Sequence, residues 1–100
     1  MEIGTGSINF GRFEGSGPRS SFADINLPNA VTQATAILTG ISGGFSPSNG
    51  DHHLGNFEVR LNSSVNGATV RVTATFGLRD WSGSWDDHYQ GTIYFAVIGD

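Results

Sequence analysis

The residues best suited to ligand chemistry are concentrated in one segment near the carboxyl end, residues 79–91. This segment holds both tryptophans, Trp81 and Trp85, and three of the nine acidic residues. Large amphipathic rings beside carboxylates and an imidazole, between Gly83 and Gly91, are typical of an exposed recognition loop, because loops on a rigid scaffold commonly carry binding residues. The alternative is that the two rings close one end of the core while the acids only keep the segment soluble.

Sugar recognition is the chemistry that these residue types suit best. A pyranose needs a flat apolar ring against its C–H face and planar polar groups for its hydroxyls. The ring can come from Trp81, Trp85 or Tyr89. The polar groups can come from the charged and imidazole side chains Asp80, Asp86, Asp87, His88 and Arg60. One site of this kind binds weakly, so we expect several copies on one oligomer.

Metal binding is less well supported than sugar recognition. Two short clusters, 51–53 and 86–88, combine carboxylates with histidines, but neighbouring residues of a strand point to opposite faces. Neither cluster has the spacing of a calcium loop or a zinc helix. We expect solvated surface histidines and no metal or other cofactor, although three copies of one histidine on a trimer axis could hold zinc.

Catalysis could in principle use paired carboxylates, or an aspartate and a histidine beside a serine. The sequence has no nucleophile elbow and no phosphate-binding glycine motif. A sandwich of this size also has little room for an enclosed pocket that excludes water. We therefore expect no enzyme and no catalytic residue.

Composition predicts a single all-β domain spanning residues 1–100. Apolar residues make up 37% and charged residues 14% of the chain, which argues against a disordered segment. Fifteen glycines and short β-branched runs indicate strands joined by turns.

Charge and sequence signals exclude several classes of partner and leave the localisation unknown. The basic residues are five arginines and the formal net charge is −4, so no positive face is available for nucleic acid or an anionic membrane. There is no cysteine, no membrane-spanning apolar run and no secretory signal. We expect synthesis in the cytoplasm or secretion by a route without a signal peptide.

Alternating apolar and polar residues predict six strands, at 7–13, 21–27, 30–39, 56–61, 68–76 and 92–98. We expect a bulge or a bend near Asp24, a central strand rather than a helix at 30–39, and a functional or interface loop at 40–55. Asn66-Gly67 predicts a hairpin with a type I′ turn, which would place Arg60 and Arg71 on one exposed face. In the strand at 56–61, we expect Glu58 and Arg60 to point outward and the alternating apolar residues Phe57, Val59 and Leu61 to point inward. The predicted fold is a six-stranded antiparallel β-sandwich.

The order of these features resembles the H-type lectins, agglutinin domains that bind N-acetylgalactosamine and related sugars. The resemblance spans most of the chain and is carried by the segments 6–8, 22–31, 56–59, 84–89 and 93–98. It implies a six-stranded sandwich assembled as trimers or pairs of trimers, with sugar sites between neighbouring subunits.

The resemblance also suggests which residues contact the sugar. Trp85, His88 and Tyr89 match the loop of that family, and Asp24 is a candidate for the acid that an earlier strand contributes. Glu58 stands where the family has an arginine, and Arg60 follows two residues later.

The sequence thus predicts a lectin for terminal galactose or N-acetylgalactosamine, assembled as a homotrimer or hexamer. Its predicted sugar-binding residues are Asp24, Arg60, Trp81, Trp85, Asp86, His88 and Tyr89. The alternative is a trimeric receptor-binding or assembly module of a phage or secretion fibre, which would not bind free glycans.

Overall fold

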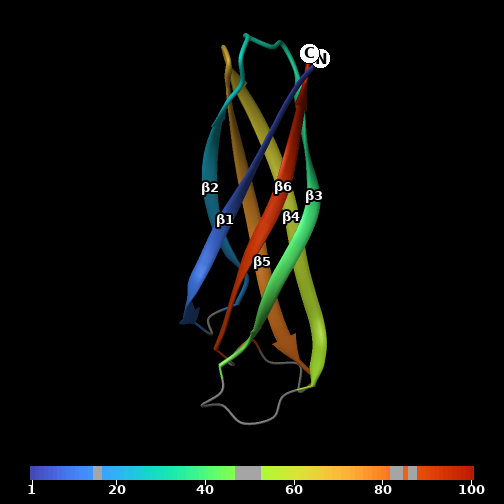
Figure 1. The fold of residues 1–100 in the computed structure, drawn as a ribbon. Coiled ribbons are helices and arrows are strands. Elements are labelled where there is room, and N and C mark those ends of the chain that lie inside the picture. Colours follow the sequence, from blue (N-terminus) through green and yellow to red (C-terminus); the bar gives the residue numbers. More distant parts are fainter. Residues whose placement is uncertain (15–16, 47–52, 82–84, 86–87) are drawn as a thin grey trace.

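The computed structural model describes residues 1–14, 17–46, 53–81, 85 and 88–100, and it contains six antiparallel strands (Figure 1). The strands are β1 (Glu2–Glu14), β2 (Arg19–Asn26), β3 (Ala34–Phe45), β4 (Leu54–Asn66), β5 (Thr69–Asp80) and β6 (Tyr89–Gly99). They form two three-stranded sheets, with the strand orders β1-β6-β3 and β2-β5-β4. The predicted all-β, six-stranded antiparallel sandwich is therefore confirmed.

The molecule is long and narrow, with extents of 48 × 19 × 18 Å. Both termini lie at one end of it, where the Met1 ammonium group is 3.4 Å from the Asp100 carboxylate (Figure 1). The tight turn between β4 and β5 lies at this end as well, whereas the end of β5 and the start of β6 lie at the other end (Figure 1). The two ends of the sandwich therefore carry different side chains.

The core lies between the two central strands, β5 and β6. Every second residue of β5 from Val70 to Leu78 is buried, and so is every second residue of β6 from Tyr89 to Val97. This alternation is the period of a strand with one apolar face. Ile8 and Phe10 of β1, with Leu27 and Val31 of the connection between β2 and β3, complete the core.

Tyr89 is a core residue, contrary to the prediction that its ring is offered to a sugar. Its side chain has no solvent exposure, and its ring makes an edge contact with Phe76 at a centroid distance of 5.5 Å. The hydroxyl group is shared between the carbonyl oxygens of Gly17 and Phe76. The Arg19 guanidinium covers the ring, with its carbon 4.6 Å from the centroid. A buried hydroxyl with partners of this kind ties the start of β6 to the rest of the fold.

Strand β3 differs from its prediction in both place and role. It begins at Ala34 and runs through part of the predicted loop to Phe45, and it is an edge strand rather than a central one. Its glycines suggest a loop in the sequence. Gly43, however, is required for packing, because a Cβ atom there would lie 2.8 Å from the Gln90 carbonyl oxygen. Residues 54 and 55 of the predicted loop belong to β4, and residues 47–52 lie outside the described chain.

The predicted bulge near Asp24 is absent, because β2 pairs with β5 without a register shift from Arg19 to Asn26. Phe22 and Ile25 do not fit one alternating pattern because their side chains point to opposite faces of β2. Ile25 packs against the core, whereas Phe22 is 54% exposed on the outer face, where it lies under the Arg71 guanidinium.

The hairpin between β4 and β5 is confirmed, but its turn differs. Asn66 pairs with Thr69, so the two turn residues are Gly67 and Ala68. Gly67 has a φ of +65°, and no described residue other than glycine has a positive φ, which is the pattern of a type II′ turn. The register also confirms that Arg60 and Arg71 lie on one exposed face. Val59 and Leu61 are half-buried as expected, but Phe57, on the side of the sandwich between β3 and β4, is 56% exposed.

The Tyr89 hydroxyl group provides a test of the core. We expect Tyr89→Phe to lower the free energy of unfolding by about 1–2 kcal/mol, because it leaves buried carbonyl oxygens without their donor. Urea unfolding measures this change. Tyr94→Phe is the matched control, since Tyr94 is exposed and should change stability by less than about 0.5 kcal/mol. Equal effects of the two substitutions would contradict the assigned role of Tyr89.

Candidate functional site

The far end of the sandwich from the termini presents an exposed tryptophan. Trp81 follows directly after β5 and is 73% exposed. Its backbone N–H donates a hydrogen bond to the carbonyl oxygen of His53 at 3.0 Å. The His53 side chain is exposed as well. The contact with the segment before β4 thus holds the Trp81 backbone, from which the exposed side chain extends.

Trp85 is half-buried and covers the outer face of the β2-β5-β4 sheet. Its ring lies so close to Gly77 that a Cβ atom there would be 2.9 Å from the ring and 3.0 Å from Pro18 Cα. The Arg79 guanidinium carbon lies 5.7 Å from the centre of the same ring. Gly77 and Arg79 are outward residues of β5, which alternate with buried ones. Trp85 is therefore neither a free plate nor a plug in the core, but a cover over one sheet face.

Arg60 lies on the same sheet face, midway along the neighbouring strand β4. The register places Glu58 opposite Gly77 and Arg60 opposite Thr75. Arg60 Nε donates a hydrogen bond to Glu58 Oε1 at 2.8 Å, and the Arg60 side chain is 73% exposed. Because the Arg60 side chain is exposed, the pair contributes only about 0–1 kcal/mol to stability. For the same reason the Arg60 guanidinium is accessible to a ligand.

Of the predicted cluster at 86–88, the structure describes only His88. The His88 side chain is exposed, and its carbonyl oxygen accepts a hydrogen bond from the Ser46 N–H at 2.8 Å, next to the end of β3. Asp86, Asp87, Asp51 and His52, which complete the predicted clusters, lie outside the described residues. In the part of the chain that is described, no group of three or more histidine, aspartate or glutamate side chains is placed to hold a metal ion.

Asp24 does not meet the tryptophans within one chain. It pairs with Arg71, and Trp81 lies ten residues further along the chain, directly after the end of β5. At about 3.3 Å per residue, the separation is roughly 33 Å. Seven residues were expected to form one site. Trp81 and His88 lie at the far end of the sandwich, and Trp85 covers Gly77 near that end. Arg60 lies midway along β4, Asp24 lies near the hairpin end and Tyr89 lies in the core. Asp86 lies outside the described residues.

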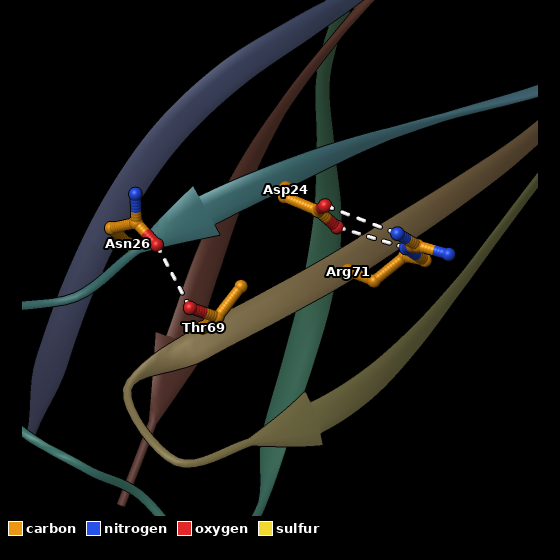
Figure 2. A network of polar contacts seen from close by, with 4 residues as sticks. All are labelled: Asp24, Asn26, Thr69 and Arg71. Carbon is orange, nitrogen blue, oxygen red and sulfur yellow. Dashed lines mark hydrogen bonds and ion pairs between the residues drawn. The ribbon is translucent and has the colours of Figure 1, made fainter.

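The surroundings of Asp24 form a separate polar network (Figure 2). Arg71 Nε and Nη2 donate hydrogen bonds to the two Asp24 carboxylate oxygens at 2.9 and 3.2 Å. These hydrogen bonds, with the attraction of the positive charge, hold the pKa of Asp24 below its usual value and raise that of Arg71. The ion pair therefore persists through the neutral and mildly acidic range.

Gly77, which lies under Trp85, was not singled out from the sequence. A lone glycine inside a strand is a sign of close approach, and Gly77 is such a residue because Trp85 lies on it. Nothing in the sequence alone shows that this approach comes from a tryptophan eight residues later.

Comparison of the chain with protein families, with curated protein sequences and with solved structures finds no match. The described part of the chain contains no helix that is long and apolar enough to cross a membrane. The functional argument therefore depends on the geometry of the chain itself.

The position of Trp85 can be tested through Gly77. We expect Gly77→Ala to displace the Trp85 ring, because the new methyl group would clash with the ring and with the Pro18 backbone. A red shift of tryptophan fluorescence, with a loss of about 1–3 kcal/mol of stability, is the expected result. Gly44→Ala is the matched control, since no atom lies within 4 Å of a Cβ at that position. An unchanged spectrum in the Gly77 variant would show that Trp85 does not lie on this face.

Proposed function

We propose that this chain is a carbohydrate-binding lectin that recognises terminal galactose or N-acetylgalactosamine at the end of the sandwich that carries Trp81. The observation that carries the proposal is the exposure of Trp81, a residue that is 73% exposed at the end of a β scaffold. An aromatic ring in this position offers an apolar plate to the C–H face of a pyranose. The resemblance to the H-type lectins supports the same sugar class.

Polar groups near the same end can bond to sugar hydroxyls. His53 and His88 present exposed imidazoles there. The Arg60 guanidinium is also exposed, but the strand register places it roughly 20 Å from Trp81, so within one chain it does not share a single sugar residue with that ring. Trp85 supports this end by covering Gly77 beside Arg79, so its proposed role is to position the site.

Multivalency is the second part of the proposal, because one shallow sugar site binds weakly. The outer face of the β1-β6-β3 sheet supports it. The outward residues of β6 from Thr92 to Ile98 and of β1 from Ile3 to Asn9 are all uncharged. They include Ile3 and Tyr94, which are 61% and 45% exposed. A face of this kind suits contact with another subunit.

The side of the sandwich between β3 and β4 carries further exposed apolar residues. A shallow apolar groove there is lined in part by Ile41, Leu54 and Phe57, all of which are more than two-fifths exposed. The edge strand β3 has no charged residue along its whole length, although charges commonly protect edges from pairing. These surfaces support assembly into a homotrimer or hexamer.

The role of Trp81 can be tested by binding to immobilised N-acetylgalactosamine. We expect Trp81→Ala to lower the affinity at least tenfold, because the apolar plate is lost, while the melting temperature stays within about 2 °C. Trp81→Phe retains an aromatic ring and should recover part of the binding. Wild-type binding by Trp81→Ala would exclude this end as the sugar site.

The assembly can be tested by light scattering on the purified chain. We expect the mass of three or six subunits, and we expect Phe57→Asp to yield smaller species, because a charge in an apolar contact is poorly solvated. Circular dichroism checks that the variant remains folded. A wild-type monomer at high protein concentration would contradict the proposed multivalency.

A further inference from the structure

A second cleft lies on the outer face of the β2-β5-β4 sheet, close to the hairpin between β4 and β5. Its volume is about 340 Å³, at the lower end of the range for small-molecule pockets. All of its lining residues are polar, namely Asp24, Ser64, Asn66, Thr69 and Arg71. None of them has a role in the proposed sugar site at the other end, because Asp24, which the sequence had suggested for it, lies here.

The strand register explains why these side chains converge. Asp24, Arg71 and Ser64 form one row across three hydrogen-bonded strands, and Thr69 and Asn66 belong to the next row on the same face. Neighbouring strands are about 4.8 Å apart, and alternate residues of one strand are about 7 Å apart. A ligand the size of one sugar ring can therefore reach both rows at once.

The polar groups of the cleft are held in place before any ligand arrives. Two hydrogen bonds orient Arg71 on Asp24 (Figure 2). The Arg71 guanidinium carbon also lies 4.0 Å from the centre of the Phe22 ring. The Thr69 hydroxyl donates a hydrogen bond to Asn26 Oδ1 at 2.8 Å. Groups that are already ordered lose less entropy on binding, which favours affinity.

The charges of the cleft select a neutral ligand. Asp24 and Arg71 offset each other, so an anion would be attracted by one and repelled by the other, and a cation likewise. Both side chains are about half-exposed and keep hydrogen-bonding capacity beyond their mutual contact, as further guanidinium N–H groups and further carboxylate lone pairs. A hydroxyl group can donate to the carboxylate and accept from the guanidinium.

We propose that this cleft is a second binding site, for a neutral ring with adjacent hydroxyl groups, such as a single sugar residue. The Asp24–Arg71 pair would bond to two neighbouring hydroxyls, and Ser64 and Asn66 would bond to the others. The exposed part of Phe22, in the adjoining row, offers an apolar surface to the C–H groups of the ring. The site is roughly 33 Å from Trp81 and does not depend on the proposed function of that end.

Nuclear magnetic resonance titration of the isotope-labelled full chain tests the cleft directly. The probes are galactose, glucose, the acyclic polyol mannitol and the zwitterion glycine, each at tens of millimolar. We expect galactose or glucose to shift the signals of Ser64, Asn66 and the Arg71 side chain in a saturable manner. We expect mannitol to shift them less, because it is not a preformed ring, and glycine to leave them unchanged.

Substitutions of residues that line the cleft test whether the sugar binds there. We expect Ser64→Ala to weaken sugar binding at the cleft about fivefold, the loss of one hydrogen bond, and Arg71→Lys to weaken it about tenfold or more, because lysine cannot form the two-point contact with Asp24. Ser20→Ala is the matched control. Its hydroxyl contacts Thr75 on the same sheet face, outside the cleft, and its removal should not change binding.

Each other outcome would overturn the cleft proposal in a recognisable way. Signals at the cleft that do not move with any sugar, or that move equally with glycine, would overturn it. Unchanged binding in both the Ser64 and the Arg71 variants would overturn it too. A response of the Trp81 indole alone would exclude the cleft as a binding site and would leave the proposed function intact. A response of the cleft alone would support the second site and would argue against sugar binding at the Trp81 end.

Discussion

The packing of β5 against β6 is the interaction on which the rest of the structure depends. These two strands are the centres of their sheets, and their buried side chains form most of the core. Phe76 contacts Tyr89 in an edge geometry and Phe10 in a tilted one, both at 5.5 Å. Because alternate residues of a strand point to opposite faces, burying one set commits the other set to the surface. The outward residues of β5 and β6 therefore define what the molecule can present to a partner.

The two outer faces that result are chemically different. The face of β2-β5-β4 carries the ion pairs Asp24–Arg71 and Glu58–Arg60. The outward residues of β1 and β6 on the opposite face, between Ile3 and Asn9 and between Thr92 and Ile98, carry no charge. A charged, grooved face suits polar ligands, and an uncharged one suits another subunit. This division supports the proposal of a multivalent carbohydrate-binding protein from two independent directions.

The all-β class, the six strands and the hairpin could be predicted from the sequence, because alternation and turn residues are local signals. The role of β3 could not, because an edge strand with several glycines has neither an alternating pattern nor the composition of a core strand. Tyr89 was also beyond a local prediction, since its burial depends on Gly17 and Phe76, which are distant in the chain. Asp24 and Trp81 were both predicted to bind sugar, and only the strand register shows that they lie at opposite ends of the sandwich.

The central claim is that this chain binds carbohydrate, and a broad glycan array probed with the labelled protein tests it most directly. The array should be read with and without a chelator, so that any contribution from a metal ion is detected. We expect selective, chelator-resistant binding to glycans that end in galactose or N-acetylgalactosamine. An array without signal at high protein concentration would exclude carbohydrate binding and favour a module that binds only a protein partner.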